Sequence, residues 1–194
     1  MNGSIALILL AAGNSKRFDG DKLAYALDGV PLLSRALRLY ADPFFDKVLA
    51  DRILVTQPER AAFCSEAEAL GFRVVQNNRP EEGISRSIRL GVQATMEKQP
   101  AGILFSVADQ PFLTEKTVYR LLERFQEDPS RIVAPASDGK RGNPVVFPAA
   151  FAAELANLHG DIGGSAVIRK HADLLDLVET DGRELKDVDL RTEV

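Results

Sequence analysis

Short runs of apolar residues alternate along this chain with longer segments that show the periodicity of amphipathic helices. The apolar runs have the length of strands and lie at positions 5–10, 52–55, 73–76, 102–107, 131–135, 144–147 and 174–178. Continuous apolar runs of this kind are typical of strands that are buried on both faces of a mostly parallel sheet. We therefore expect a central sheet built largely from these segments.

Three of the segments between the runs carry apolar residues three and four positions apart, as helices packed on a sheet do. The stripes consist of Leu33, Ala36, Leu37 and Tyr40, then Ile84, Ile88, Val92 and Met96, and finally Val118, Leu121, Leu122 and Phe125. Pro31 suits the start of the first helix, and Thr114 suits the N-cap of the third. The alternation of strands and helices predicts one Rossmann-like α/β domain over residues 1–194, with three layers and a mostly parallel central sheet.

The composition narrows the classes of partner. With 194 residues, 45% of them hydrophobic and 27% charged, the chain resembles an ordinary globular domain, and its net charge of -4 does not suit nucleic acid. The single cysteine, Cys64, excludes an internal disulfide and a zinc site built from several cysteines. No stretch reaches the roughly 20 apolar residues of a membrane span. A buried first strand explains the run at 5–12 better than a signal peptide does, so we expect a cytoplasmic protein without membrane partners.

The first apolar run ends in small residues and leads into a basic loop. This stretch reads Leu10-Ala11-Ala12-Gly13-Asn14-Ser15-Lys16-Arg17-Phe18, with Lys22 shortly after. Small residues let a ligand approach the backbone, whose successive N–H groups can turn inward around an anion. Arg17 offers a fork of donors to phosphate oxygens, and Lys16 and Lys22 add mobile positive charges. The loop predicts a site for a small anionic ligand that carries phosphate, although the same residues could form a solvated turn with incidental charges.

An acidic residue, Asp109, follows the apolar run at 102–107. A carboxylate at the end of a buried strand is costly unless another group compensates its charge, and Mg²⁺ prefers one or two carboxylates together with substrate phosphates. Pro111 would fix the turn so that Asp109 faces the ligand crevice. Asp109 is therefore a candidate Mg²⁺ ligand. The alternative is that it caps the next helix, for which Thr114 is the better N-cap.

A third polar stretch, at 77–89, leads from a strand into the second predicted helix. Asn78, Gly83, Ser85 and Ser87 in this stretch could bind the base or ribose of a nucleotide, because N–H groups and hydroxyls are available at a helix start. Either serine could equally be a simple N-cap. Ligands of open α/β sheets bind beyond the carboxyl ends of the strands, so we expect this stretch, the loop at 13–22 and residues 109–111 to line one crevice.

Two further polar, glycine-containing stretches, at 140–144 and 160–164, precede a strand and a helix. Both could line the pocket of an acceptor substrate, and either could equally be a plain turn. His159, His171 and Cys64 show no arrangement that suits general-base or nucleophilic catalysis.

In this order and combination, the stretches resemble the molybdenum-cofactor nucleotidyltransferases and the wider group of MobA-like NTP transferases. The opening pattern of that family is matched by Leu10-Ala11-Ala12-Gly13, Arg17-Phe18 and Lys22-Leu23, and its metal-binding D-Q-P is matched by Asp109-Gln110-Pro111. The match continues through Gly83-Ile84-Ser85, Arg141-Gly142-Asn143-Pro144 and Gly160-Asp161-Ile162-Gly163-Gly164. It spans nearly the whole chain.

The resemblance implies a GT-A-like fold and the transfer of a nucleoside monophosphate to an acceptor phosphate, with release of pyrophosphate. It also implies that Gly13, Arg17 and Lys22 hold the triphosphate and that Asp109 holds Mg²⁺. Ala12 stands where guanylyl-transferring relatives have glycine and is similar to the cytidylyl-transferring branch, so CTP rather than GTP is the expected substrate. Members of that branch form molybdopterin cytosine dinucleotide, which implies a molybdopterin-type acceptor and a molybdenum hydroxylase as partners.

The chain departs from the family at its C-terminal end. Family members often end in D-x-D-T-P-x-D, which supplies a second acidic contact to the metal. The corresponding stretch at 187–193 keeps the paired aspartates, Asp187 and Asp189, and loses the rest of the pattern. Either aspartate could face the metal.

Two other functions stay open at this point. The first loop would also suit a nucleotidyltransferase that uses another phosphorylated acceptor, namely a sugar phosphate, a methylerythritol phosphate or phospholactate. The second alternative is a protein that binds a nucleotide or cofactor without catalysis and inserts the cofactor into a partner enzyme. Asp109, Lys22 and Arg17 argue against a purely binding role.

Overall fold

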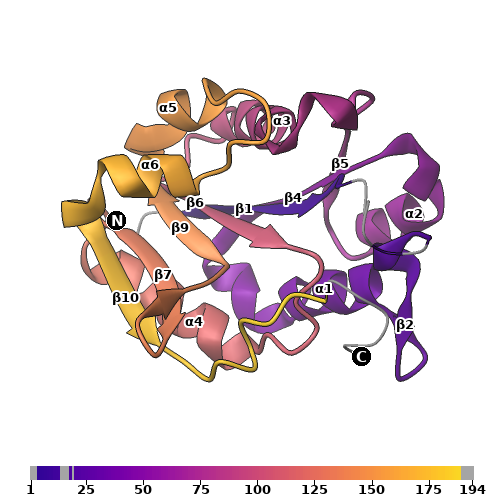
Figure 1. Cartoon of the computed structure of the whole chain (residues 1–194), viewed down its shortest axis with the longest axis horizontal. Coiled ribbons are helices and arrows are strands. Elements are labelled where there is room, and N and C mark those ends of the chain that lie inside the picture. The colour runs from indigo at the N-terminus through magenta and orange to yellow at the C-terminus, as the bar shows by residue number, and fades with distance from the viewer. Residues whose placement is uncertain (1–3, 14–17, 19, 189–194) are drawn as a thin grey trace.

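The computed structural model describes residues 4–13, 18 and 20–188. The strands of its main sheet are β1 (Ile5–Ala11), β4 (Leu49–Thr56), β5 (Arg73–Gln76), β6 (Gly102–Val107), β7 (Ile132–Ser137), β8 (Lys140–Arg141), β9 (Val145–Pro148) and β10 (Leu175–Glu179). Within the described residues they form one eight-stranded sheet in the order β10-β7-β9-β6-β1-β4-β5, with β8 paired to β7 (Figure 1). A separate antiparallel hairpin consists of β2 (Ala26–Leu27) and β3 (Val30–Pro31).

Most strand pairs in the main sheet are parallel. β1 runs parallel to both β4 and β6, β5 runs parallel to β4, and β10 runs parallel to β7. Only the later hairpins reverse the chain, because β9 is antiparallel to β6 and β7, and β8 is antiparallel to β7. The predicted α/β class with a mostly parallel sheet is confirmed. The carboxyl ends of β1, β4, β6 and β7 consequently meet at one edge of the sheet.

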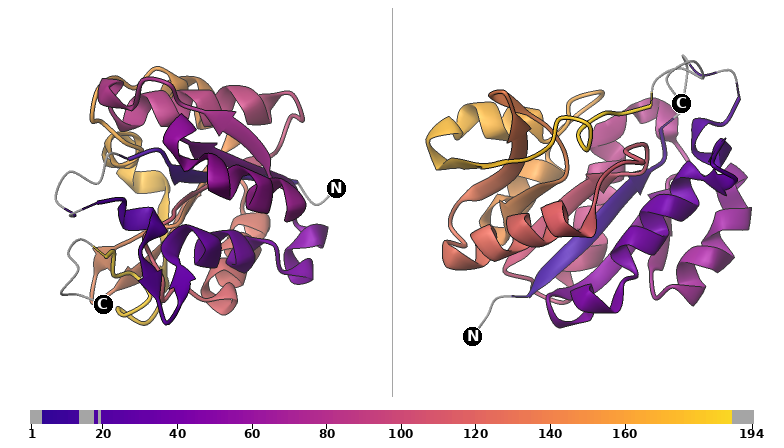
Figure 2. Two further views of the ribbon diagram at one scale, coloured as in Figure 1. Left: turned by 90° about the vertical axis from the view of Figure 1, so that its right-hand side faces the viewer. Right: turned by 90° about the horizontal axis from the view of Figure 1, so that it is seen from below.

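Helices cover both faces of the sheet (Figures 1 and 2). The α3 face is covered by α3 (Ile84–Met96), α5 (Ala152–Ala156) and α6 (Ser165–Lys170), and the α1 face by α1 (Leu32–Tyr40), α2 (Ala61–Ala69) and α4 (Glu115–Glu127). Alternate side chains of a strand point to opposite faces, so Leu7 and Leu9 pack on the α1 face and Ile8 packs on the α3 face. Short 3-10 helices lie at Lys22–Ala24, Pro43–Lys47, Pro58–Arg60, Pro80–Glu82, Ala149–Phe151 and Ala172–Leu174.

The predicted helix starts are confirmed in two places. Pro31 directly precedes α1, and the Thr114 hydroxyl caps α4 by accepting a hydrogen bond from the Thr117 N–H at 3.3 Å. The apolar stripe predicted for α3 is only partly buried, because Ile88 is 2% exposed whereas Ile84 is 39% exposed. No helix among the described residues has the length and apolar character needed to cross a lipid bilayer.

Strand β4 begins earlier than the apolar run at 52–55 predicted. The added part contains Asp51, whose side chain is 4% exposed and which pairs with Arg73 at 2.6 Å and with Lys98 at 3.3 Å. Burial alone would raise the pKa of Asp51, but the hydrogen bonds and charges of these two cations outweigh burial and lower it. A charged residue can therefore sit in this strand because its partners come from β5 and from the end of α3, which the local pattern does not reveal.

Candidate active site

The carboxyl ends of β1 and β6 and the start of α3 enclose one cleft of about 440 Å³. It is lined by Leu10, Ala11, Ala12, Gly13, Phe18, Lys22, Leu23, Pro80, Glu81, Gly83, Ile84, Ser87, Val107, Ala108, Asp109 and Asp161. β1 and β6 are adjacent parallel strands in which Leu10 pairs with Val107, so the residues that follow them emerge side by side. The expectation that the three polar stretches line one crevice is confirmed.

The backbone at the end of β1 is held in place by side chains from the segment after β4. The Gln57 amide donates a hydrogen bond to the Ala12 carbonyl at 2.7 Å. Ala12 itself is 5% exposed, and its side chain belongs to the core of the α3 face. Gly13 is exposed, and a Cβ added there would meet no atom of the described residues within 4 Å, apart from its chain neighbours. Among these residues, the space beside the Gly13 backbone is therefore open.

Arg60 connects this backbone to Asp21, which lies near the end of the basic loop at residues 13–22. Its side chain is 5% exposed, and its guanidinium donates to the carbonyls of Ala11 and Gly13, the latter at 3.1 Å. It also makes a bidentate pair with the Asp21 carboxylate, at 2.9 Å from Nε and 2.8 Å from Nη2. Burial would raise the pKa of Asp21, but the hydrogen bonds and charge of Arg60 outweigh it and lower the pKa. One side chain thus joins residues 11–13 to residue 21.

Sequence reasoning did not single out Arg60. The available signal was its position directly after β4, since β4 is the parallel neighbour of β1 and its carboxyl end lies at the same edge. The Asp21 carboxylate also accepts a hydrogen bond from the Leu23 N–H at 3.1 Å and so caps the short helix that carries Lys22. By holding Asp21, Arg60 therefore also helps to fix the position of Lys22.

Lys22 and Asp109 form an ion pair in the cleft. The Lys22 Nζ lies 2.5 Å from the Asp109 Oδ2, and the two side chains are 13% and 21% exposed. The charge of Asp109 at the end of its strand is thus compensated by Lys22, the residue that sequence analysis assigned to phosphate. The helix-capping alternative for Asp109 does not apply, because Thr114 caps α4.

The start of α3 is organised by Asn77, which lies next to the predicted Asn78. Asn77 is fully buried, and its amide nitrogen donates to the Ser87 hydroxyl at 3.0 Å. Its amide oxygen accepts from the Arg79 N–H and from Arg86, both at 3.0 Å. Ser87 lines the cleft, whereas Asn78 is exposed outside it and Ser85 is buried behind it. Two of the four residues predicted here, Gly83 and Ser87, are thus brought to the cleft.

Gly83 packs against the loop at 160–164. Its φ is +90°, and a Cβ at this position would lie 2.3 Å from the carbonyl of Gly160, so only glycine fits. The Ser85 N–H also donates to the Gly160 carbonyl, at 3.2 Å. This contact fixes the loop against α3 and brings Asp161 to the wall of the cleft. The stretch at 140–144 does not contribute to the lining.

The C-terminal segment returns to Asp109. The Val188 N–H donates to the Asp109 carbonyl at 3.0 Å, and the Val188 side chain packs with Phe18 and Leu32. The exposed Asp187 therefore lies beside Asp109 along the backbone. The predicted site residues that lie outside the described residues are Asn14, Ser15, Lys16, Arg17 and Asp189.

The carboxylates of the cleft fit a divalent cation that also binds phosphates. No group of three or more His, Cys, Asp or Glu side chains placed to hold a metal exists among residues 4–13, 18 and 20–188. Mg²⁺ does not need such a cage, because it is bound through one or two carboxylates plus substrate phosphates. Asp109, which pairs with the Lys22 ammonium, and Asp161 both line the cleft, so a cation and two carboxylates are present for such a ternary site.

The chain is similar in sequence to proteins of one known family. A family model described as the MobA-like NTP transferase domain matches residues 7–174. A probable molybdenum cofactor guanylyltransferase from Thermococcus sibiricus is 27% identical over 128 residues, which cover 66% of this chain and 60% of that relative. A protein of the same name from Thermococcus gammatolerans is 37% identical over 87 residues, which cover 43% of this chain and 42% of that relative. The matched regions thus span less than two thirds of these relatives' own length.

Solved structures share the whole fold at lower sequence identity. Rv0371c from Mycobacterium tuberculosis H37Rv superposes with a TM-score of 0.81 at 22% identity, covering 100% of this chain and 96% of that one. A manganese complex of Rv0371c gives a TM-score of 0.71 at 22% identity, covering 92% and 89%. The 4-diphosphocytidyl-2C-methyl-D-erythritol synthase of Anaerococcus prevotii gives 0.78 at 15% identity, covering 99% and 93%. Because the family model matches most of its length, the chain belongs to the MobA-like NTP transferase family.

Proposed function

We propose that this protein is a Mg²⁺-dependent cytidylyltransferase that transfers CMP from CTP to the phosphate of a molybdopterin-type molybdenum cofactor. The observation that carries the proposal is the cleft in which the open Gly13 backbone, Lys22 and Asp109 meet. The acceptor class is supported by the curated relatives, both of which are named probable molybdenum cofactor guanylyltransferases. A divalent metal is supported by the related fold that was solved with manganese.

The reaction needs positioning and charge neutralisation more than a catalytic base. An acceptor phosphate oxygen attacks the α-phosphorus of CTP, and the bond from that phosphorus to the bridging oxygen breaks, its electron pair leaving with pyrophosphate. The attacking phosphate is already ionised at neutral pH, so no side chain has to remove a proton. This fits a cleft whose lining contains neither histidine nor cysteine among the described residues. The rate gain then comes from orientation and from fixed positive charge.

The described residues divide this work between them. Asp109 would hold Mg²⁺, with Asp161 or Asp187 as a second carboxylate, and bound Mg²⁺ would neutralise phosphate charge and orient the triphosphate. The Gly13 backbone donates to phosphate oxygens. The Lys22 ammonium exchanges the Asp109 carboxylate for the outer phosphates and stabilises the departing pyrophosphate. Arg17 and Lys16, which we assign to the same phosphates from sequence, would add charge from the basic loop.

Ala12 is the residue on which the preference for CTP rests. Its methyl group belongs to the core of the α3 face, and Ala12 lines the same cleft as Gly83 and Ser87. We expect the wild-type protein to prefer CTP to GTP and the Ala12→Gly variant to narrow that preference, because removing the methyl makes room for a purine. A group of this size decides about 1–3 kcal/mol, or roughly ten- to two-hundredfold, and supplies no hydrogen bond to guanine, so complete reversal is not expected.

The measurement is kcat/KM for CTP and GTP in both proteins with the same acceptor. A wild-type preference for GTP would agree with the names of the curated relatives and would overturn the cytidylyl assignment, while nucleotidyl transfer would stand. An unchanged ratio in Ala12→Gly would place base recognition elsewhere, for example on the Asn77–Ser87 side of the cleft.

Pyrophosphate release tests the proposed function as a whole. The protein is mixed with Mg²⁺, each triphosphate in turn and each candidate acceptor: molybdopterin, a sugar phosphate, methylerythritol phosphate and phospholactate. We expect release only with CTP and molybdopterin or its molybdenum form. Pyrophosphate release with another acceptor would identify that compound as the substrate in place of molybdopterin. Tight CTP binding without release for any acceptor would favour a cofactor-inserting protein instead.

A further inference from the structure

Two arginines, Arg141 and Arg169, pair with no carboxylate in the part of the chain that the structure describes. Most arginines in the described part of the chain pair with carboxylates. The half-buried Arg141 of β8 instead donates a hydrogen bond from Nη1 to the adjacent Gly142 carbonyl at 3.3 Å. Arg169 of α6 is exposed and has no carboxylate partner among the described residues. Burial, together with the charge of Arg169, lowers the pKa of Arg141, so the two guanidinium groups repel each other.

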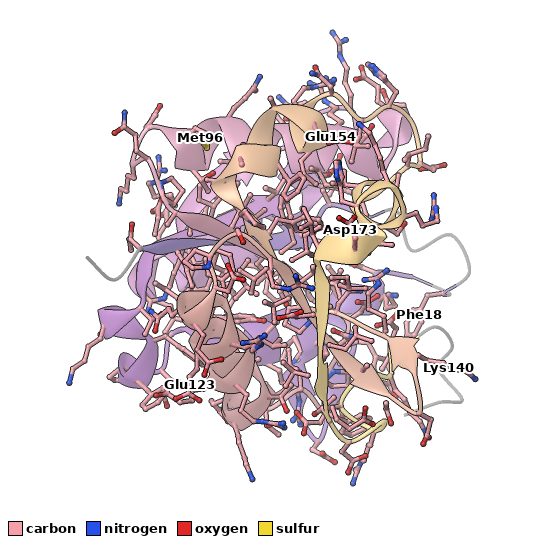
Figure 3. The ribbon with its side chains drawn as sticks, turned by 90° about the vertical axis from the view of Figure 1, so that its left-hand side faces the viewer. Phe18, Met96, Glu123, Lys140, Glu154 and Asp173 are labelled. Atoms are coloured by element: carbon pink, nitrogen blue, oxygen red, sulfur yellow. The ribbon has the colours of Figure 1, made fainter. Side chains whose placement is uncertain are left out.

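The strand register shows to which side Arg141 points. β8 pairs with β7 so that Arg141 lies opposite Ala136 and Lys140 lies opposite Ser137. Cross-strand neighbours project from the same face of a sheet, and Ala136 alternates in phase with Ile132 and Ala134, which pack on the α3 face. Arg141 therefore projects toward the α3 face, where α6 carries Arg169. Lys140 projects from the opposite face and extends outward in the view from the β10 side (Figure 3).

The hairpin that carries Arg141 lies at the same edge of the sheet as the cleft, toward β7 and away from β4 and β5, on which α3 packs. The end of β7 is two strand positions from the end of β6, or about 10 Å at the usual strand spacing. The hairpin is tied to the Asp109 segment, because a Cβ on Gly142 would lie 2.9 Å from Leu185, whose carbonyl accepts a hydrogen bond from Gln110 at 3.2 Å. The loop that brings Asp161 to the cleft leads directly into α6. A ligand that extends from Asp109 along this edge would reach both guanidinium groups.

We propose that Arg141 and Arg169 form a binding site for the phosphate group of the acceptor substrate, separate from the triphosphate site at Gly13 and Lys22. Two guanidinium groups that lack a carboxylate partner among residues 4–13, 18 and 20–188 suit a phosphomonoester dianion, which offers several oxygens to their planar donor forks and removes their mutual repulsion. The inference rests on the proposed function, since it takes the second substrate to be a phosphomonoester. It adds the place at which that substrate is recognised.

Inorganic phosphate is the probe for this site. It is titrated by calorimetry into protein saturated with Mg²⁺ and a non-hydrolysable CTP analogue, which occupies the triphosphate site. We expect one phosphate to bind the wild-type protein, and we expect Arg141→Gln and Arg169→Gln each to weaken that binding by about ten- to a hundredfold. Lys140→Gln and Lys170→Gln are matched controls that remove a neighbouring positive charge, and we expect each to change the affinity less than about twofold because exposed charges are screened.

Each outcome bears on the proposal. Absence of phosphate binding to the wild-type protein, or equal weakening by all four variants, would overturn the arginine site. If the analogue still binds in those cases, the proposed function stands, whereas failure of the analogue to bind would overturn the proposed function itself. In turnover, Arg141→Gln should raise KM for the acceptor and leave KM for CTP unchanged. A rise in KM for CTP alone would assign the arginines to the nucleotide and contradict the proposal.

Discussion

Replacing Asp109 by asparagine is expected to abolish nucleotidyl transfer while the protein stays folded. The substitution keeps the shape of the side chain but removes the charge that would hold Mg²⁺ and that now pairs with Lys22 at 2.5 Å. Loss of one preorganised electrostatic contact typically lowers kcat by about 10²–10³, and loss of the metal ligand should reach at least the upper end of that range. Stability should fall by only about 1 kcal/mol, because both partners keep some contact with solvent.

The matched measurement is Mn²⁺ affinity in the presence of a CTP analogue, read by electron paramagnetic resonance together with kcat. Glu81→Gln is the control, since Glu81 is another carboxylate of the cleft wall but lies on the side of α3. We expect Asp109→Asn to lose both Mn²⁺ binding and turnover and Glu81→Gln to retain both. Wild-type turnover of Asp109→Asn at ordinary Mg²⁺ concentration would remove Asp109 from the metal site.

Replacing Arg60 by methionine is expected to weaken both the fold and the triphosphate site. The change leaves the Ala11 and Gly13 carbonyls and the Asp21 carboxylate without their donor. We expect a loss of about 2–3 kcal/mol in the free energy of unfolding, which is less than for a fully buried ion pair because Asp21 is partly exposed. Triphosphate affinity should fall about ten- to a hundredfold, because the two ends of the basic loop must then be ordered by the ligand.

Arg52→Met separates the two effects. Arg52 is also largely buried and donates to the Tyr40 carbonyl and to Asp46, but it does not line the cleft. Denaturant unfolding should show destabilisation for both variants, and calorimetry with CTP should show lost affinity only for Arg60→Met. Unchanged CTP affinity in a folded Arg60→Met protein would mean that the basic loop does not depend on this arginine.

The contribution of Arg60 to the free energy of unfolding should also depend on pH. In the folded protein the pKa of Asp21 lies below its ordinary value of 3.8. The ion pair therefore stabilises the fold fully above about pH 4, and that stabilisation is lost as the pH falls through the folded-state pKa. The gap in stability between the wild-type protein and Arg60→Met should consequently shrink in acid.

The features that sequence predicted well depend on local pattern. The continuous apolar runs located the buried strands, and the small residues before Gly13 together with the polar turn at Asp109 located the cleft. These worked because parallel strands bring their carboxyl ends to one edge whatever their order in the sheet. In α3, the apolar stripe predicted that Ile84 would be buried, but Ile84 is exposed and lines the cleft.

The features that sequence missed depend on partners distant in the chain. Arg60 reads as an ordinary surface charge until its carbonyl partners, more than forty residues away, are known. The sequence does not distinguish the roles of the adjacent residues Asn77 and Asn78. Only the fold shows that Asn77 is buried and donates a hydrogen bond to Ser87. The charge of Asp109 suggested a metal, but the sequence did not show that Lys22 would meet it directly.

Locating Mn²⁺ by anomalous scattering, in crystals of the protein with Mn²⁺ and a non-hydrolysable CTP analogue, tests the central claim most directly. The claim is that the cleft between β1, β6 and α3 holds a metal and a triphosphate together. We predict an anomalous peak within direct coordination distance of the Asp109 carboxylate, with the triphosphate on the Gly13 backbone and with Lys22 turned from Asp109 to a phosphate oxygen. A metal peak away from Asp109, or a triphosphate outside this cleft while the Lys22–Asp109 pair stays intact, would contradict the account.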